Sequence, residues 1–274
     1  MKINSFNPVA SRYSRKVTQY RTPQYLTLVH ELNLSGYETV LDIGIGSGEL
    51  SIQIARQLNT DGFLYGVDLS PEMIKLAKRK AQQANLENIS FELGDALNLK
   101  YDDNAFDVIT SSNAYPWVPD REKFLHEAFR VLKPGGIFGL VALSNKCYTE
   151  FSSAFKKVLK AHPGLFPIGQ PFEIMGAKLH TVNVLAQAVR KAGFDIEKGF
   201  TLSTEEPIKP VDYIERVNAI VNENYLDYLP PNGIRNRVKQ TLNDALASKN
   251  GSLKITESSV FILARKTQTV NNLN

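Results

Sequence analysis

The feature that most constrains this chain is a regular alternation of strand-like and helix-like segments over its first half. Short apolar runs, typical of buried strands, cover residues 40–43, 63–67, 89–93, 106–110 and 137–143. Between them, apolar residues recur at helical spacing, as in Leu50, Ile54 and Leu58. Such alternation is typical of right-handed βαβ units. The sequence therefore predicts an α/β fold, Rossmann-like and doubly wound, with helices on both faces of a mostly parallel sheet.

The second half of the chain departs from this alternation. Residues 22–34 read as a helix, and 209–248 as two more, while 194–202 and 258–265 read as strands six and seven of the sheet. Another amphipathic helix is indicated by Phe151, Phe155, Val158 and Leu159. We expect a helical cap segment over residues 1–35. The remaining residues, 36–274, form the main domain, with a lid insertion at about 144–180 and a helical insertion at about 209–248.

Composition narrows the class of protein. The chain has 274 residues, a net charge of +4 and one cysteine, Cys147, so no internal disulfide can form and a reducing cytoplasm is expected. No apolar run reaches the roughly 18–20 residues of a membrane span, and the polar N-terminus lacks a signal-peptide core. The basic residues lie on helix faces rather than in one patch, so we do not expect nucleic acid as a partner. We also expect no metal ligands and no insertion into a membrane. The oligomeric state is not indicated.

A glycine-rich turn follows the first strand, in Asp42-Ile43-Gly44-Ile45-Gly46-Ser47-Gly48-Glu49. A dinucleotide fingerprint would carry a glycine at position 49 and hold a pyrophosphate. Here two carboxylates, Asp42 and Glu49, bracket the turn and would repel a pyrophosphate. They suit a ligand that carries an ammonium and a sulfonium, which describes S-adenosylmethionine. The alternatives are a tight turn without a ligand and a hydride-transfer dehydrogenase, which the acidic residues disfavour.

The turn resembles the first motif of the class I S-adenosylmethionine-dependent methyltransferases, and the spacing of later acidic residues fits that family. The segment 66–73, with Asp68, resembles the family's second motif, and Gly94-Asp95-Ala96 resembles its adenine-binding corner. The resemblance implies that Asp68 binds the ribose hydroxyls, since a carboxylate accepts two hydrogen bonds at once. The cofactor-binding residues expected on this basis are Tyr20, Asp42, Gly44, Gly46, Gly48, Asp68, Leu69, Met73, Asp95, Ala96 and Ser111.

The first residues carry a second, shorter resemblance. Phe6-Asn7-Pro8-Val9-Ala10-Ser11-Arg12-Tyr13 looks like the F-x-x-V-A-x-x-Y opening of quinone-biosynthesis methyltransferases, departing from it at Asn7, where that family has Asp. The resemblance suggests that Tyr13 or Tyr20 folds over the methionine end of the cofactor. Packing of an N-terminal helix is the alternative interpretation.

Acceptor-binding residues are expected after strand four and in the lid insertion. Residues 117–120, Trp-Val-Pro-Asp, are similar to members that methylate small carboxylic acids, and the Asn-Pro-Pro-Tyr motif of base-amine methyltransferases is missing. Several aromatic residues close together can line a pocket for an apolar substrate. The substrate-lining residues expected here are Tyr115, Trp117, Tyr148, Phe151, Phe155 and Phe166. Tyr115 and His162 are the catalytic candidates, His162 as a base because it is expected to be the only histidine in a non-helical segment.

The sequence thus predicts an enzyme of the S-adenosylmethionine-dependent methyltransferase type, which releases S-adenosylhomocysteine. Its expected acceptor is a small, fairly apolar molecule, such as a carboxylate, a quinone-like compound or a secondary metabolite, methylated on O, C or N. Two alternatives stay open: a tRNA or protein methyltransferase, and a non-catalytic regulator that binds S-adenosylmethionine.

Overall fold

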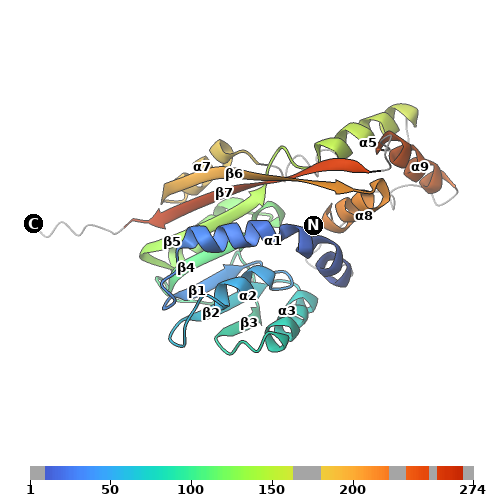
Figure 1. Cartoon of the computed structure of the whole chain (residues 1–274). Helices are drawn as coiled ribbons and strands as arrows, with labels where there is room; N and C mark the ends of the chain where they lie inside the picture. Colours follow the sequence, from blue (N-terminus) through green and yellow to red (C-terminus); the bar gives the residue numbers. More distant parts are fainter. Residues whose placement is uncertain (1–9, 163–179, 222–232, 247–251, 268–274) are drawn as a thin grey trace, which may run out of the picture.

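The fold centres on a seven-stranded sheet with the order β3-β2-β1-β4-β5-β7-β6, in a computed structural model that describes residues 10–162, 180–221, 233–246 and 252–267 (Figure 1). All pairings are parallel except those of β7, which runs antiparallel to both neighbours. The predicted fold class is therefore confirmed. The strands are β1 (Thr39–Ile43), β2 (Phe63–Asp68), β3 (Ile89–Leu93), β4 (Phe106–Ser112), β5 (Leu132–Leu143), β6 (Phe194–Ile208) and β7 (Leu253–Lys266).

Helices cover both faces of the sheet, because successive strand residues point to opposite sides. One face packs under α1 (Ala10–Leu32), α2 (Glu49–Ala55) and α3 (Pro71–Gln83), and the other under α4 (Arg121–Val131) and α7 (Val182–Lys191). In β1, Val40 joins the first core, while Leu41 and Ile43 join the second. Strands β1 and β4 read as apolar because most of their residues are buried on both faces, whereas the edge strand β3 is mostly exposed.

Local sequence explains where several helices begin. Ser70 precedes α3, with Pro71 at the first helical position, and the Ser70 hydroxyl accepts a hydrogen bond from the Met73 N–H at 3.3 Å. Asp120 caps α4 in the same way, accepting from the Lys123 N–H at 2.9 Å. These caps hold the loops that leave the carboxyl ends of β2 and β4.

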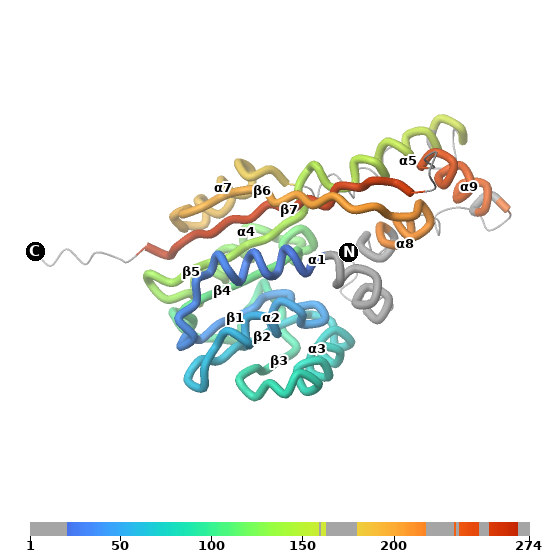
Figure 2. Tube along the Cα trace, viewed as in Figure 1, coloured from blue at the N-terminus to red at the C-terminus, as the bar shows by residue number. Residues whose placement is uncertain are grey.

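A helical lobe projects beyond the carboxyl edge of the sheet. It contains α5 (Thr149–Ala161), α8 (Pro210–Val221) and α9 (Ile234–Leu246), which pack on the extended ends of β6 and β7 (Figure 2). The two strands pair along their whole length, from Phe194 with Lys266 to Ile208 with Leu253. The lobe therefore joins the two predicted insertions into one body with a core of its own.

Several helices and strands are longer than predicted. Helix α1 starts at Ala10 rather than near residue 22, and it lies along the sheet, with Leu28 and Leu32 in the core. Strands β6 and β7 extend well past residues 202 and 258 toward the lobe, where they pair with each other beyond the last residue of β5. In this part of β6, exposed residues alternate with half-buried ones. Such a ribbon has no continuous apolar run. The division into a cap segment, 1–35, and a main domain, 36–274, stays a prediction.

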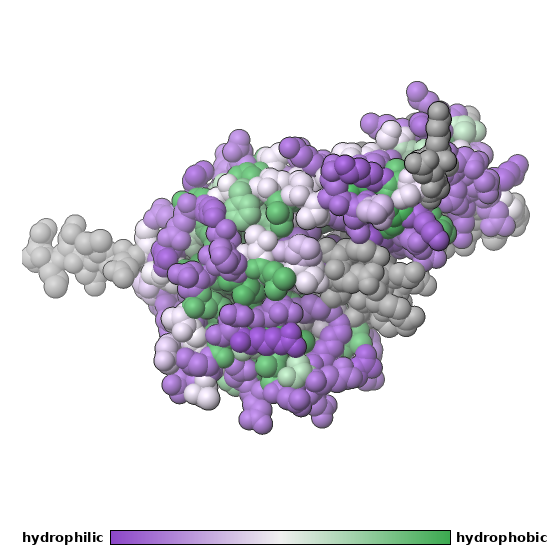
Figure 3. All heavy atoms as spheres, in the orientation of Figure 1, coloured by the Kyte–Doolittle hydropathy of each residue, from purple (hydrophilic) through white to green (hydrophobic). Residues whose placement is uncertain are grey.

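The surface is mostly hydrophilic on the face shown in Figure 3, with smaller apolar patches between the charged side chains. Within the described ranges, no helix is both long enough and apolar enough to cross a membrane.

Candidate functional site

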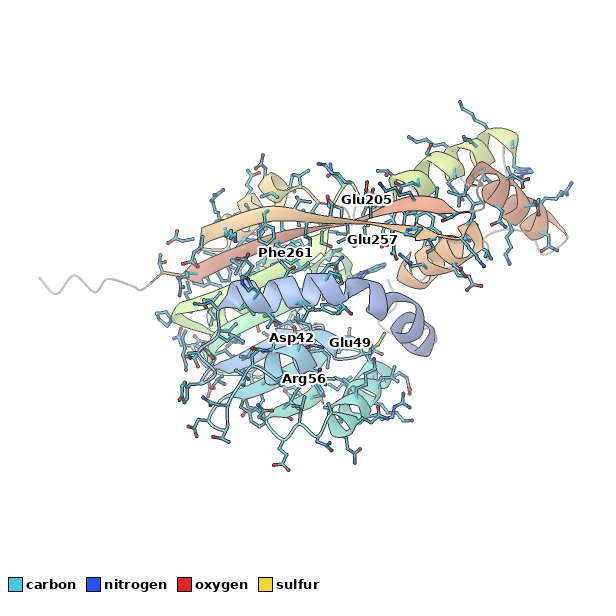
Figure 4. The ribbon with its side chains drawn as sticks, viewed as in Figure 1. Asp42, Glu49, Arg56, Glu205, Glu257 and Phe261 are labelled. Atoms are coloured by element: carbon cyan, nitrogen blue, oxygen red, sulfur yellow. The ribbon has the colours of Figure 1, made fainter. Side chains whose placement is uncertain are left out.

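The carboxyl ends of β1 and β4 mark the point where the strand order reverses. From β1 the chain moves outward to β2 and β3, then returns to β4 on the other side of β1. In open parallel sheets, ligands bind outside the strands at such a point, because the loops on either side diverge and leave room. The glycine turn after β1 lies there, bracketed by Asp42 and Glu49 (Figure 4).

The glycine turn requires glycine at all three positions. Gly44, Gly46 and Gly48 have φ of +73°, +53° and +85°, in the left-handed region that side chains disfavour. A Cβ on Gly44 would lie 2.2 Å from the Cβ of Ala114, whereas a Cβ on Gly46 would meet no described residue within 4 Å. Gly44 therefore permits close packing with the loop after β4, and Gly46 presents bare backbone on an open side. Bare backbone of this kind fits a ligand lying along the turn.

Asp68, at the end of β2, is tied to the glycine turn. Its carboxylate accepts hydrogen bonds from the Gly46 N–H at 2.8 Å and from the Ser70 N–H at 2.9 Å. Burial raises the pKa of Asp68, although both backbone donors oppose the rise. Because a carboxylate offers about four acceptor sites, Asp68 can receive ribose hydroxyls and keep both backbone bonds. Asp68 fits the ribose-binding role that its motif implies.

Asp42 lies beneath the turn rather than on its open side. Its carboxylate accepts from the Ser51 hydroxyl at 2.6 Å and from the Thr110 hydroxyl at 2.8 Å, and the side chain is 1% exposed. Burial raises the pKa of Asp42 to about 6, with a further increase from the Asp68 carboxylate and an opposing effect of the two hydroxyls. Asp42 therefore ties β1 to α2 and β4, and it can act on a cationic ligand through its charge.

Glu49 would repel an anion less strongly than the sequence suggested. Lys80, on α3, forms an ion pair with its carboxylate, and the Ser47 hydroxyl donates to it as well. The pairing neutralises the second of the two charges on which the argument against a pyrophosphate rested. The close packing of the turn and the position of Asp68 now carry that argument.

The other predicted cofactor residues lie around the same edge with different exposures. Asp95 is exposed, and its carboxylate accepts from the Leu97 N–H at 2.9 Å in a turn after β3. Leu69 is 40% exposed beside Asp68, whereas Met73 is buried in α3 and Ala96 packs against the core. The Ser111 hydroxyl is buried and donates to the Ile43 carbonyl at 2.9 Å, which links β4 to β1. These contacts give Met73 and Ser111 structural roles, and their cofactor roles stay predictions.

The loop after β4 brings aromatic residues next to the glycine turn. Ala114 contacts the turn, and the short helix η2 (Tyr115–Trp117) follows it directly. Tyr115 is buried and Trp117 half-buried, and the Arg121 guanidinium lies 5.6 Å from the centre of the Tyr115 ring. Burial raises the pKa of Tyr115, and Arg121 opposes that rise. Tyr115 is therefore a neutral phenol near neutral pH.

The predicted lid aromatics pack inside the lobe. Phe151 and Phe155 of α5 are each 2% exposed and stack on each other, with ring centres 5.8 Å apart. Tyr148, just before α5, is buried in the same core, and the Cys147 thiol donates to the Glu257 carboxylate at 3.6 Å. This packing favours a structural role for the three aromatic residues, and their contact with an acceptor stays a prediction.

The choice of His162 as base rested on an expectation that was wrong. His162 ends α5, and its Nε2 atom lies 3.1 Å from the Thr241 hydroxyl of α9, which gives it a partner inside the lobe. It is not the only histidine outside a helix, because His180 occupies the segment just before α7. Sequence reasoning missed His180 because it is isolated by sequence position and belongs to no motif.

Three of the aromatic predictions fall where no side chains are described. Tyr13 and Tyr20 belong to the part of α1 whose side chains are not described, and Phe166 lies outside the described residues. Their proposed contacts with the cofactor and the acceptor stay predictions.

Comparisons with known proteins give the family. A sequence model described as a methyltransferase domain matches residues 34–171, just over half of the chain. The demethylmenaquinone methyltransferase of Oceanobacillus iheyensis is 33% identical over 154 residues, covering 56% of this chain and 62% of that protein. The corresponding enzyme of Lactobacillus johnsonii is 29% identical over 162 residues, covering 59% and 64%. The matches thus span less than two thirds of the length of these relatives.

A solved structure agrees on the fold. A crystal structure named as a putative methyltransferase from Bacillus halodurans has a TM-score of 0.64 and 19% identity, and the match covers 90% of this chain and 100% of that one. The family match, the fold and the glycine turn agree with one another. This chain therefore belongs to the methyltransferase domain family, the S-adenosylmethionine-dependent class that its motifs resemble.

Proposed function

We propose that this chain transfers the methyl group of S-adenosylmethionine to a small, quinone-type ring molecule. The observation that carries the proposal is the contact between Gly44 and Ala114, where the glycine turn meets the loop after β4. Methyl transfer requires nucleophile, methyl carbon and sulfur nearly in line, so cofactor and acceptor must share one small space. A turn that fits the cofactor, packed against a loop rich in aromatic residues, supports such an arrangement.

The quinone-type acceptor rests on three observations. The similar proteins are named demethylmenaquinone methyltransferases. The first residues of this chain resemble the opening of quinone-biosynthesis methyltransferases. Tyr115 and Trp117 follow β4, where an aromatic ring of the acceptor can stack or pack edge to face.

The residues of the chain have separate roles in the proposed reaction. Bound S-adenosylmethionine supplies an activated methyl group, whose carbon–sulfur bond breaks as the bond to the acceptor forms, leaving the electron pair on sulfur. Asp68 orients the ribose, and the open side of Gly46 receives the cofactor against the backbone. Asp42 contributes negative charge under the turn, which favours a cationic cofactor over its neutral product. The acceptor loses a proton to water when the nucleophile is a hydroxyl or a ring carbon.

Methyl-labelled S-adenosylmethionine tests the proposal. The purified protein is incubated with the label and a short-chain naphthoquinone lacking the ring methyl, offered both oxidised and chemically reduced, and parallel samples contain bulk RNA or an extract protein fraction. We expect label in the organic extract of the ring compound and much less with the Asp68→Ala variant at the same cofactor concentration. Label in RNA or protein would replace the acceptor class, and cofactor binding without transfer to any sample would indicate a regulator.

A further inference from the structure

Among the described residues, two polar side chains at the carboxyl ends of β4 and β5 are buried, and each has one atom without a hydrogen-bond partner. They are Asn113 Oδ1 and His180 Nε2, on residues that are 5% and 6% exposed. Buried polar atoms are nearly always paired, because an unpaired one loses its bonds to water and gains none in return. Two such atoms near one functional site therefore suggest a ligand that supplies the missing bonds.

Asn113 is held rigidly next to the cofactor turn. Its N–H donates to the Val141 carbonyl at 2.8 Å, and its side-chain Nδ2 donates to the Ser112 hydroxyl at 3.1 Å. Its φ of +60° lies in the left-handed region, which Asn tolerates better than other residues with side chains. The next residue, Ala114, makes the close contact with Gly44. The Oδ1 atom, which can only accept a hydrogen bond, is thus one residue from the turn.

The backbone of His180 is hydrogen-bonded to the end of β5, the strand next to β4. Its N–H donates to the Leu143 carbonyl at 2.8 Å, and its carbonyl accepts from the Asn145 N–H at 2.9 Å, so its backbone is fixed at the end of β5. The imidazole ring lies against Tyr115, with ring centres 5.6 Å apart. Tyr115 follows Asn113 by two residues, which brings both unpaired atoms to the adjacent carboxyl ends of β4 and β5.

The surroundings keep the imidazole of His180 neutral. Burial and, to a smaller extent, the nearby Arg121 guanidinium together lower its pKa to about 4, while Tyr115 is a neutral phenol. A neutral imidazole can accept a hydrogen bond through Nε2 when the proton is on Nδ1. Both unpaired atoms can therefore accept a hydrogen bond from a hydroxyl or amine group of one ligand.

We propose that Asn113 and His180 are positioning residues that bind the methyl acceptor through its hydrogen-bond donors and hold it in line with the cofactor. This inference rests on the proposed function. It replaces His162 by His180 as the histidine that serves the acceptor, and it requires an acceptor with at least one hydroxyl or amine group. Tyr115, between the two, packs against the ring of the same acceptor.

The test uses variants that keep the local packing. His180→Phe retains an aromatic ring against Tyr115 and loses the nitrogen, while His180→Gln restores a polar atom. Asn113→Gly keeps the left-handed backbone and loses the oxygen, while Asn113→Asp retains an oxygen. His126→Leu, on the exposed face of α4, is the matched histidine control.

For each variant we would measure the S-adenosylmethionine Kd by calorimetry and the acceptor KM and kcat by label transfer. His180→Phe and Asn113→Gly should raise the acceptor KM about tenfold or more with the cofactor Kd within twofold of wild type, and the Gln and Asp variants should recover part of the loss. An unchanged acceptor KM in active, folded His180→Phe and Asn113→Gly overturns the inference and leaves the proposed function standing. Loss of cofactor binding together with KM would also overturn it, since the residues would then act on the fold. No transfer by the wild-type protein to any acceptor overturns both.

Discussion

The open side of Gly46 offers the sharpest test of the cofactor site. Gly46→Ala places a methyl group at φ of +53°, with no atom of the described residues within 4 Å of it. The strain of a left-handed alanine costs about 1–2 kcal/mol, a fall in Tm of roughly 2–8 °C for a chain of this size. If the cofactor lies on that side, the added methyl group would overlap with it. We then expect at least tenfold weaker S-adenosylmethionine binding, about 1.4 kcal/mol.

Gly233 provides the matched control. It has φ of +73° and, like Gly46, no described residue within 4 Å of an added Cβ, but it lies before α9 in the lobe. Gly233→Ala should therefore lose similar stability and keep wild-type cofactor affinity. Gly44→Ala should be much less stable than either, because its methyl group would overlap Ala114. Equal affinities of Gly46→Ala and Gly233→Ala in calorimetry would refute the assignment of this surface to the cofactor.

Three further predictions follow from the site and the lobe. Asp68→Ala should weaken S-adenosylmethionine binding by about 1–3 kcal/mol through loss of a charged acceptor; unchanged affinity in calorimetry would remove Asp68 from the site. Burial raises the pKa of Asp42 to about 6, above its value of about 3.9 in the unfolded chain, so the folded state keeps the proton up to a higher pH. The stability of wild type relative to Asp42→Asn should then fall by up to about 3 kcal/mol between pH 4 and pH 6 in urea unfolding, and parallel curves would contradict this. Phe155→Ala should cost the lobe about 3–5 kcal/mol and increase hydrogen exchange in α5, α8 and α9 without changing cofactor affinity; unaltered exchange there would count against the lobe core.

The parts of the fold predicted from sequence are those that depend on neighbouring residues. The central strands β1 and β4 are buried on both faces, so each reads as a short apolar run, and Ser70 with Pro71 marks a helix start by its own chemistry. The ends of β6 and β7 escaped prediction because they pair only with each other. In that part of β6, exposed and half-buried residues alternate and most of them are polar, which is weaker evidence of a strand than a continuous apolar run.

The candidate site was also only partly predictable from the sequence. Glycine at positions 44, 46 and 48 indicated a tight turn from the sequence alone, because the left-handed backbone favours glycine wherever it occurs. The residue types after the strands indicated a cofactor with positive charge. The pairing of Lys80 with Glu49 could not be read from the chain, since nothing in the spacing of α3 shows which of its lysines faces the turn.

The sequence by itself determined the class of fold, the glycine turn and the family resemblance, because periodicity, backbone conformation and short motifs are local properties. Only the tertiary structure decided that Ala114 closes on Gly44, that Asp42 is buried by Ser51 and Thr110, and that His180 lies against Tyr115. Most of these contacts join residues more than 60 positions apart. They depend on the order in which the strands pair, which no local pattern contains.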